Sequence, residues 1–156
     1  MRNKPIIFFD IDYTLFDVAW FKKSNLKDYK LYEEVKNTLN NLSEIAALGI
    51  FSEGEINFQK TKLETTGIKK YFEESNIHIF ADKESNIETA IEKYKGNKVF
   101  LIEDKLNILF EVKKKMPFVF GIWMKRGWYA ENQKPIPGFK PDAEITSLDK
   151  VISIVF

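Results

Sequence analysis

Apolar and polar positions divide the chain into short apolar runs and longer stretches with helical spacing, which follow one another in turn. Short runs rich in β-branched and aromatic residues are typical of buried strands, whereas apolar residues three and four positions apart are typical of helices that bury one face. Strands are predicted over residues 6–9, 48–52, 77–80, 98–104 and 118–124. Helices are predicted over residues 30–47, 56–66, 85–95 and 106–115, with a last one over 147–155, although residues 151–156 could equally be a strand.

Glycines and capping residues predict where several of these helices begin and end. Gly49, Gly67 and Gly96 each follow a helical stretch and are expected to end it. Ser85 and Glu88 match a capping box, in which a serine and a glutamate three residues later satisfy free backbone N–H groups at a helix start.

The alternation of strands and helices predicts one α/β domain over residues 1–156, with a Rossmann-like parallel sheet between two layers of helices. In such folds ligands bind beyond the carboxyl ends of the strands. Those ends carry Asp10 and Asp12, Ser52, residues 80–83, Glu103 and Asp104, and Lys125 and Arg126. Acids, a hydroxyl group and a lysine are therefore expected to converge at one edge of the sheet.

Length and composition restrict the kinds of protein that this chain can be. A chain of 156 residues can bury a sizeable core, and 24 Lys and Arg against 23 Asp and Glu leave no broad charge for nucleic acid or a membrane surface. The lack of cysteine excludes disulfides and thiolate metal sites and fits a reducing compartment. No apolar stretch reaches the roughly 18–20 residues that cross a bilayer, and the first one is too short for a signal peptide. We therefore expect a cytoplasmic protein that binds no membrane and has no broad nucleic-acid surface.

The two acids in IIFFDIDYTLFD, residues 6–17, call for an explanation, because carboxylates this close repel each other and lose hydration. Taken alone, the pair fits a helix cap or a turn after a strand equally well. Acids that converge from a second strand end instead favour a site for Mg²⁺, which prefers oxygen ligands. Beside such a cation Asp10 could attack phosphorus as a nucleophile, and Asp12 could transfer protons. Ser52 and Lys83 would then bind the phosphoryl oxygens.

Four motifs, in this order, resemble those of the haloacid dehalogenase-like (HAD) hydrolases, most of which are Mg²⁺-dependent phosphatases. DIDYTL, residues 10–15, is similar to the first motif, Asp-x-Asp-x-Thr-Leu/Val, and GIFS, residues 49–52, is similar to the second, an apolar strand that ends in Ser or Thr. Lys83 resembles the lysine of the third motif, and VFLIED, residues 99–104, resembles the fourth, an apolar strand that ends in paired acids. The tail KPDAEITSLDKV, residues 140–151, resembles the usual family ending, a Pro-Asp and a strand before the last helix.

The resemblance implies a role for each matching residue. Asp10 would be the nucleophile and a metal ligand, and Asp12 would be the acid and base and bind the metal through its backbone carbonyl. Thr14 would order the loop at the phosphate site, where Ser52 and Lys83 would hold phosphate. Asp104 with Glu103 would complete the Mg²⁺ site. The pattern is incomplete, because Tyr13 replaces the commonest glycine, and Ile108 and Leu109 stand where many relatives carry another acid. A catalytically silent interaction module of this fold and a phosphate-accepting receiver domain are therefore alternatives, and Glu103 could equally support a ligand without binding the metal.

The spacing of the motifs leaves no room for the separate cap domain that family members often carry. Only residues 16–29 separate the first motif from the next helix, and one helix and one strand fill the interval from Ser52 to Lys83. We expect a bare core with a short flap beside an open site, which a second copy of the chain could cover. The expected substrate is a small phosphomonoester, with a phosphoprotein or a polynucleotide end as the alternative. In the flap, Trp20 and Phe21 would either pack on the body or border the substrate.

Other polar residues are expected to lie outside the site. Lys60 and Lys62 are alternatives for the phosphate-binding lysine, but they fall in a helix and are predicted to be surface residues. His78, the lone histidine, lies within an apolar strand and is predicted to be structural. Lys125 and Arg126 are predicted to form a solvated turn, with substrate contact as the alternative.

Overall fold

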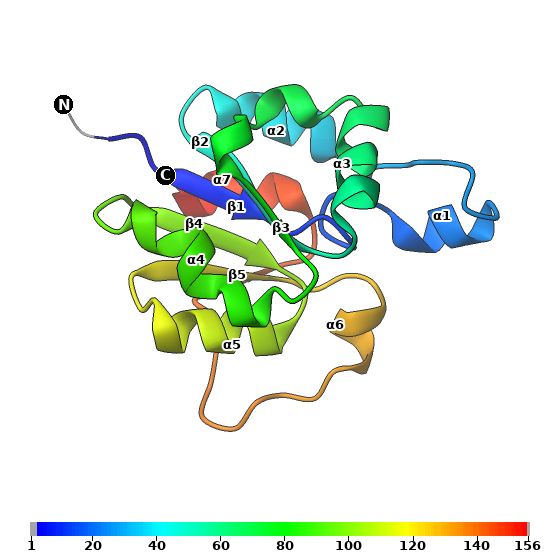
Figure 1. Ribbon diagram of the computed structural model, residues 1–156. Coiled ribbons are helices and arrows are strands. Elements are labelled where there is room, and N and C mark those ends of the chain that lie inside the picture. Colours follow the sequence, from blue (N-terminus) through cyan, green and yellow to red (C-terminus); the bar gives the residue numbers. More distant parts are fainter. Residues whose placement is uncertain (1–2, 156) are drawn as a thin grey trace.

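The computed structural model describes residues 3–155 as a parallel sheet between two layers of helices (Figure 1). The sheet has the strand order β3-β2-β1-β4-β5-β6, and every neighbouring pair is parallel. The strands are β1 (Ile6–Phe9), β2 (Ala47–Glu53), β3 (Ile77–Phe80), β4 (Val99–Glu103), β5 (Val119–Met124) and β6 (Ala143–Ile145). The predicted Rossmann-like α/β class is therefore confirmed, and β6 is the strand predicted from the tail. The order differs from the 2-1-3-4-5 order of flavodoxin-like receiver domains, so the receiver alternative is wrong.

Side chains alternate between the two faces along each strand, so the apolar strands of this sheet present apolar side chains on both faces. Helices cover both faces and bury these side chains. The helices of the described chain are α1 (Val18–Lys23), α2 (Val35–Ser43), α3 (Ile56–Thr65), α4 (Ile87–Ile91), α5 (Leu106–Lys115), α6 (Trp128–Asn132) and α7 (Val151–Val155). On one face Ile7 and Phe9 join a core with α2, α3 and α7. On the other face Ile6 and Phe8 join a core with α4 and α5. β1 is thus buried from both sides and fixes the position of the loop that follows it.

Gly49 was predicted to end a helix, but this prediction is wrong, because Gly49 lies within β2. The preceding helix, α2, begins at Val35 and ends at Ser43, so it is shorter than the predicted residues 30–47. A Cβ atom at position 49 would lie 2.6 Å from a ring carbon of Phe8 on the neighbouring strand. Glycine is needed there for the close approach of two strands, not for a turn.

Several helix boundaries also differ from the prediction. The capping box of Ser85 and Glu88 is wrong: α4 begins only at Ile87, and the Ser85 hydroxyl donates to Asp82 Oδ2 at 2.6 Å. α6 was not predicted, because five residues are too few for a recognisable helical spacing. The C-terminal segment is helical over residues 151–155, so the strand alternative is wrong there, and position 156 lies outside the described residues.

The flap predicted over residues 16–29 is a short connection that contains α1 (Figure 1). Phe21 is buried against Phe16 and Tyr29, with ring centroids 5.3 and 4.9 Å apart, so this aromatic packs on the body. Trp20 is 42% exposed, and its indole N–H donates to Asp28 Oδ2 at 2.6 Å. Residues 3–155 contain no separate cap domain, and none of their helices has the length and apolar character needed to span a membrane.

His78 has the structural position that was predicted for it. The His78 ring is half-buried and packs against Phe8, and its Nε2 atom lies 3.0 Å from the Tyr94 hydroxyl oxygen. It lies on β3, on the face that α4 covers, and it does not line the cavity described below.

Candidate active site

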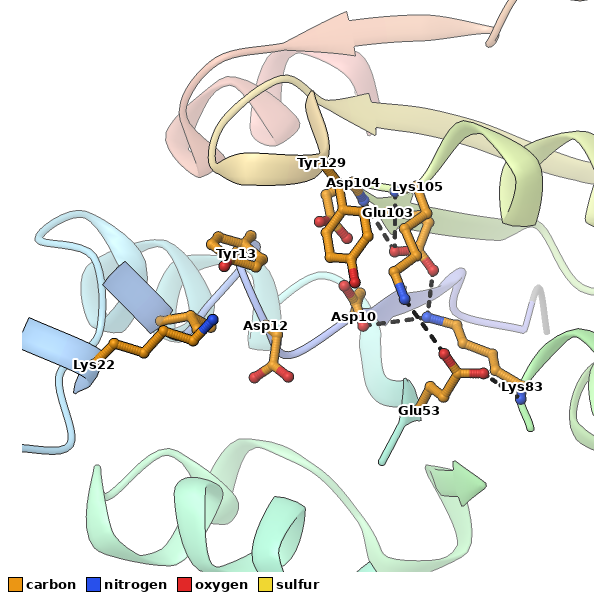
Figure 2. A pocket seen from close by; sticks show the side chains of 11 residues that line it. Asp10, Asp12, Tyr13, Lys22, Glu53, Lys83, Glu103, Asp104, Lys105 and Tyr129 are labelled. Carbon is orange, nitrogen blue, oxygen red and sulfur yellow. Dashed lines mark hydrogen bonds and ion pairs between the residues drawn. The ribbon is translucent and has the colours of Figure 1, made fainter. Parts of the chain in front are cut away.

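A cavity of about 260 Å³ opens at the carboxyl edge of the sheet (Figure 2). Its walls come from the ends of β1, β2 and β4, the flap helix α1, the loop after β3 and the short helix α6. The lining residues are Asp10, Asp12, Tyr13, Val18, Lys22, Glu53, Lys83, Glu103, Asp104, Lys105 and Tyr129. The cavity therefore lies where the strand ends were predicted to bring acids and a lysine together.

Lys83 connects the acids of two strands. It lies beyond β3, is 2% exposed, and places Nζ 3.2 Å from Oδ1 of Asp10, which follows β1. The same ammonium group forms an ion pair with Oε1 of Glu103 at the end of β4. Figure 2 shows the ammonium end of Lys83 between the carboxyl groups of Asp10 and Glu103, with a dashed line to each. A buried ammonium group is stable only with such partners.

Burial and neighbouring charges control protonation in this group. Burial raises the pKa of Asp10 to about 6, and the Glu103 charge adds to the shift while Lys83 opposes it. For Lys83, burial acts to lower the pKa, but Asp10 and Glu103 outweigh it and raise the pKa above its ordinary value. Burial acts to raise the pKa of Glu103, but the Lys83 ammonium holds it below its ordinary range. Lys83 and Glu103 are thus a charged pair beside Asp10.

Asp10, Glu103 and Asp104 form a buried acid cluster that could hold a metal ion. One oxygen from each lies within 4.8 Å of the other two. Both oxygens of Glu103 already have partners in the protein. Oε2 accepts the backbone N–H of Asp104 at 3.0 Å, and Oε1 forms the ion pair with Lys83. Both carboxylate oxygens of Asp104 are buried and have no hydrogen-bond partner among the described residues. Burial and the charges of Asp10 and Glu103 raise the pKa of Asp104 to about 12. Buried oxygens of this kind need a partner, and a cation that prefers oxygen ligands would supply one.

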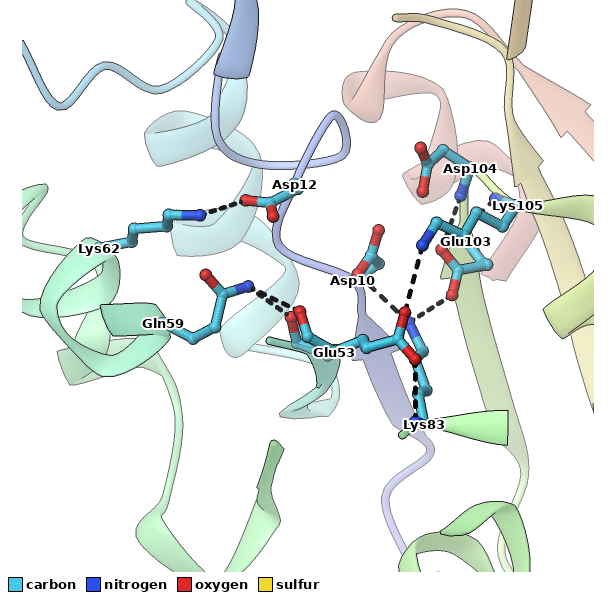
Figure 3. Close-up of polar contacts among 10 residues, drawn as sticks. Asp10, Asp12, Glu53, Gln59, Lys62, Lys83, Glu103, Asp104 and Lys105 are labelled. Atoms are coloured by element: carbon cyan, nitrogen blue, oxygen red, sulfur yellow. Dashed lines mark hydrogen bonds and ion pairs between the residues drawn. The ribbon is translucent and has the colours of Figure 1, made fainter. Parts of the chain in front are cut away.

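Asp12 lines the cavity beside Asp10 and is bound from behind by Lys62 (Figure 3). The distance from Lys62 Nζ to Asp12 Oδ1 is 2.7 Å. The prediction that Lys62 is a surface residue is wrong, since it is only 5% exposed. Lys60, two positions earlier on α3, does point to solvent and pairs with Glu74. Burial raises the pKa of Asp12 above its ordinary value, and the Lys62 charge opposes this shift.

Ser52 was predicted to hold phosphate and Thr14 to order the loop at the phosphate site, but neither is among the described residues that line the cavity. Both are fully buried. The Ser52 hydroxyl accepts a hydrogen bond from Nε2 of Gln59 at 3.0 Å, while the Thr14 hydroxyl has no partner among the described residues. The residue that reaches the cavity from β2 is Glu53, one position after Ser52.

Three residues that line the cavity lie outside the predicted flap and motif positions and were not predicted: Glu53, Lys105 and Tyr129. The Glu53 carboxylate lies 3.3 Å from Lys105 Nζ and accepts the backbone N–H of Lys83 at 3.1 Å. Lys105 Nζ lies 4.5 Å from the centre of the Tyr129 ring. Glu53 directly follows Ser52, and Lys105 directly follows Asp104. Their positions next to predicted strand-end residues could therefore have identified them. Tyr129 lies on α6, and the sequence pattern carried no signal for that helix.

Arg126 was predicted to lie in a solvated turn, and this is wrong. Its guanidinium group forms a bidentate pair with Glu34, with both N–O distances at 3.0 Å. It also donates to the carbonyl oxygens of Tyr13 at 3.3 Å and Thr14 at 2.5 Å. Tyr13 has a positive φ of 65°, a conformation that favours glycine, which explains why glycine is the commonest residue at this point of the motif. Lys125 is exposed, as predicted.

No family model and no curated protein matches this sequence. Solved structures do match the fold over nearly the whole chain. A protein from Burkholderia xenovorans LB400 that is classed as a haloacid dehalogenase-like hydrolase is 19% identical, with a TM-score of 0.79 over 97% of this chain and 96% of that one. The HAD-hydrolase YfnB from Bacillus subtilis, in a magnesium-bound form, is 13% identical, with a TM-score of 0.76 over 99% of both chains. A protein from Clostridium difficile that is classed as a phosphatase is 15% identical, with a TM-score of 0.75 over 100% of both. The chain therefore has the HAD-like fold, as its motifs predicted, without a cap in the described residues.

Proposed function

We propose that this chain is a Mg²⁺-dependent phosphomonoester hydrolase that works through an aspartyl-phosphate on Asp10. One observation carries the proposal: the carboxyl group of Asp10 meets a buried lysine and a buried acid cluster at the base of an open cavity. The cavity has room for a phosphate and a small attached group. The intact acids favour this function over a silent interaction module of the same fold.

The reaction has two steps in which Asp10 first takes and then releases the phosphoryl group. The Asp10 carboxylate attacks phosphorus, and the bond from phosphorus to the leaving oxygen breaks. Asp12 gives that oxygen its proton. Asp12 then removes a proton from the water that attacks the phosphoryl group, so phosphate leaves and the Asp10 carboxylate is restored. Lys83, which faces Asp10, would contact the phosphoryl oxygens and spread their charge.

The acid cluster fits Mg²⁺ by its chemistry. Asp10, Glu103 and Asp104 carry three carboxyl groups against the single ammonium of Lys83, and the Asp104 oxygens have no partner in the described chain. We assign Asp10, Asp104 and the backbone carbonyl of Asp12 as ligands, with Glu103 either as a further ligand or as the residue that fixes Lys83. When bound, the ion would neutralise charge on the transferred phosphoryl group. The magnesium-bound form of the structurally similar YfnB supports this choice.

Ser52 and Thr14 would act from behind the phosphate site. Both are buried outside the cavity wall, so we propose that they hold the ends of β2 and the loop after β1 in place. A cavity of about 260 Å³ favours a small phosphomonoester as the substrate. A homo-oligomer that covers the open mouth is the alternative way to enclose a substrate, and the mass of the protein in solution tests it.

The test is hydrolysis of p-nitrophenyl phosphate with Mg²⁺ and with EDTA. We expect turnover with Mg²⁺ and none above background with EDTA. Asp10→Asn should lose at least about 10³-fold in kcat while its circular dichroism spectrum stays the same, because an amide is nearly isosteric but a poor nucleophile. Asp149→Asn, at an exposed position, is the matched control. Turnover in EDTA, or an Asp10→Asn variant that keeps more than about a tenth of the wild-type rate, would refute the mechanism.

A further inference from the structure

Lys62 is a buried cation that contacts the candidate site without lining it. Its Nζ donates to Asp12 Oδ1 at 2.7 Å, and 6% of its side chain is exposed against 35% for that of Asp12. Among the described residues that line the cavity, Asp12 is present and Lys62 is not. Lys62 can therefore act on a bound substrate only through Asp12.

The helix α3 holds Lys62 in this position. Gln59, three residues earlier and on the same side of the helix, donates to Ser52 Oγ at 3.0 Å and to the Glu53 carbonyl at 3.2 Å. Figure 3 shows both side chains reaching from α3 toward the loops of the site. The rings of Phe16 and Phe58 flank the ammonium group, with centres 4.9 and 4.5 Å away. Water is largely excluded from Lys62, so its bond to Asp12 is its main polar contact in the described structure.

We propose that Lys62 is a positioning residue for proton transfer by Asp12. The inference rests on the proposed function. Lys62 binds Oδ1 of the carboxyl group, so the group cannot rotate freely and Oδ2 is kept for the transferred proton. Oδ1 can accept the Lys62 hydrogen bond whether or not Oδ2 carries a proton. The same contact therefore serves the step in which Asp12 gives a proton to the leaving oxygen and the step in which it takes one from water.

A purely structural ion pair makes a different prediction from a positioning residue. An alcohol that leaves from phosphorus needs a proton, whereas nitrophenolate leaves readily without one. Misplacing Asp12 should therefore slow the cleavage of an alkyl phosphate much more than that of an aryl phosphate. A structural defect would slow both alike. The parameter kcat/KM isolates the first chemical step, since release of the leaving group ends it.

The experiment compares Lys62→Met with the matched control Lys60→Met, which changes a half-exposed lysine on the same helix. For each protein, kcat/KM is measured with glycerol 2-phosphate and with p-nitrophenyl phosphate in Mg²⁺. We expect Lys62→Met to lose about 10²-fold with the alkyl ester and no more than about 5-fold with the aryl ester, because general acid catalysis contributes about 10²–10⁴-fold. Lys60→Met should match the wild type with both. Equal losses of Lys62→Met on the two esters, or no loss on either, would overturn the proposal.

Two further measurements separate the role of Lys62 from a folding defect and from a failure of the proposed function. Melting temperatures and circular dichroism establish whether Lys62→Met is folded, and Lys62→Gln replaces it in the same comparison if it is not. Crystal structures of the wild type and the folded variant show the Asp12 carboxyl group directly. We expect it to turn away from its wild-type orientation, and an unchanged orientation would overturn the proposal even if no ester is hydrolysed. A wild type that is inactive on both esters would instead refute the proposed function.

Discussion

Replacement of Arg126 by Met should destabilise the protein strongly, although Arg126 lies in a loop. Its guanidinium group contacts the Glu34 carboxylate twice and the carbonyl oxygens of Tyr13 and Thr14, and it stacks on the Tyr32 ring with a centroid distance of 3.6 Å. Methionine keeps much of the apolar contact with the ring and removes every hydrogen bond. The variant therefore leaves Glu34 unpaired and frees the loop that carries Asp12.

The size of the effect follows from the burial of the pair. Side-chain exposure is 14% for Arg126 and 24% for Glu34, so the pair is largely but not fully shielded from water. Breaking a buried pair by removing one partner costs about 3–5 kcal/mol, and the residual exposure points to the lower end, about 3 kcal/mol. For a domain of this length, each kcal/mol lowers the melting temperature by about 2–4 °C, which gives a loss of about 6–12 °C.

Urea unfolding and thermal melts, both followed by circular dichroism, measure this loss. Lys125→Met is the matched control, because Lys125 is the preceding residue and forms an exposed pair with Glu144 that should contribute less than about 1 kcal/mol. A double-mutant cycle of Arg126→Met with Glu34→Gln should show a coupling energy of about 1–2 kcal/mol. A melting temperature of Arg126→Met within about 2 °C of that of the wild type, or an equal loss in Lys125→Met, would contradict a stabilising role of the Arg126 contacts.

Three further predictions concern the metal site, pH and the flap. Asp104→Asn should raise the stability of the metal-free protein by about 1–2 kcal/mol, because the folded state must protonate Asp104 at neutral pH, whereas an amide is neutral without binding a proton. The same variant should weaken Mg²⁺ binding at least about 10-fold in calorimetry, and affinity within about 3-fold of the wild type would contradict the ligand assignment. The raised pKa of Asp10, from 3.8 to about 6, means that the Asp10 carboxyl binds more protons in the folded state than in the unfolded state between these values. Without metal, this group alone should therefore lower the stability by about 3 kcal/mol as the pH rises from about 4 to 7. Urea melts in EDTA should show this slope in the wild type and a flatter one in Asp10→Asn. Phe21→Ala should lower the free energy of unfolding by about 3 kcal/mol because Phe21 is buried, whereas Trp20→Ala should lower it by less than about 1 kcal/mol. Equal losses in melting temperature would contradict the different packing of the two aromatics.

The sequence alone determined the order of elements and the edge of the sheet where the site lies. Short apolar runs separated by helical spacing specify strands and helices locally, and parallel strands must end at a common edge. For that reason Asp10, Lys83 and Asp104 could be assigned to one place although they are far apart in the chain. The motif order added the HAD-like fold. The absence of a cap followed from the number of residues available between motifs.

The tertiary structure decided which polar side chains reach this site and which face solvent. Lys60 and Lys62 are two positions apart on α3, and the helical turn between them directs one to Glu74 and the other to Asp12, 50 positions away. Arg126 finds Glu34 at a separation of 92 positions. Such contacts depend on how helices and loops pack on the sheet, and a lysine or arginine has the same local pattern whether it is solvated or buried beside a carboxylate. Local periodicity can therefore place an element, but only the packed fold determines the partner of a long charged side chain.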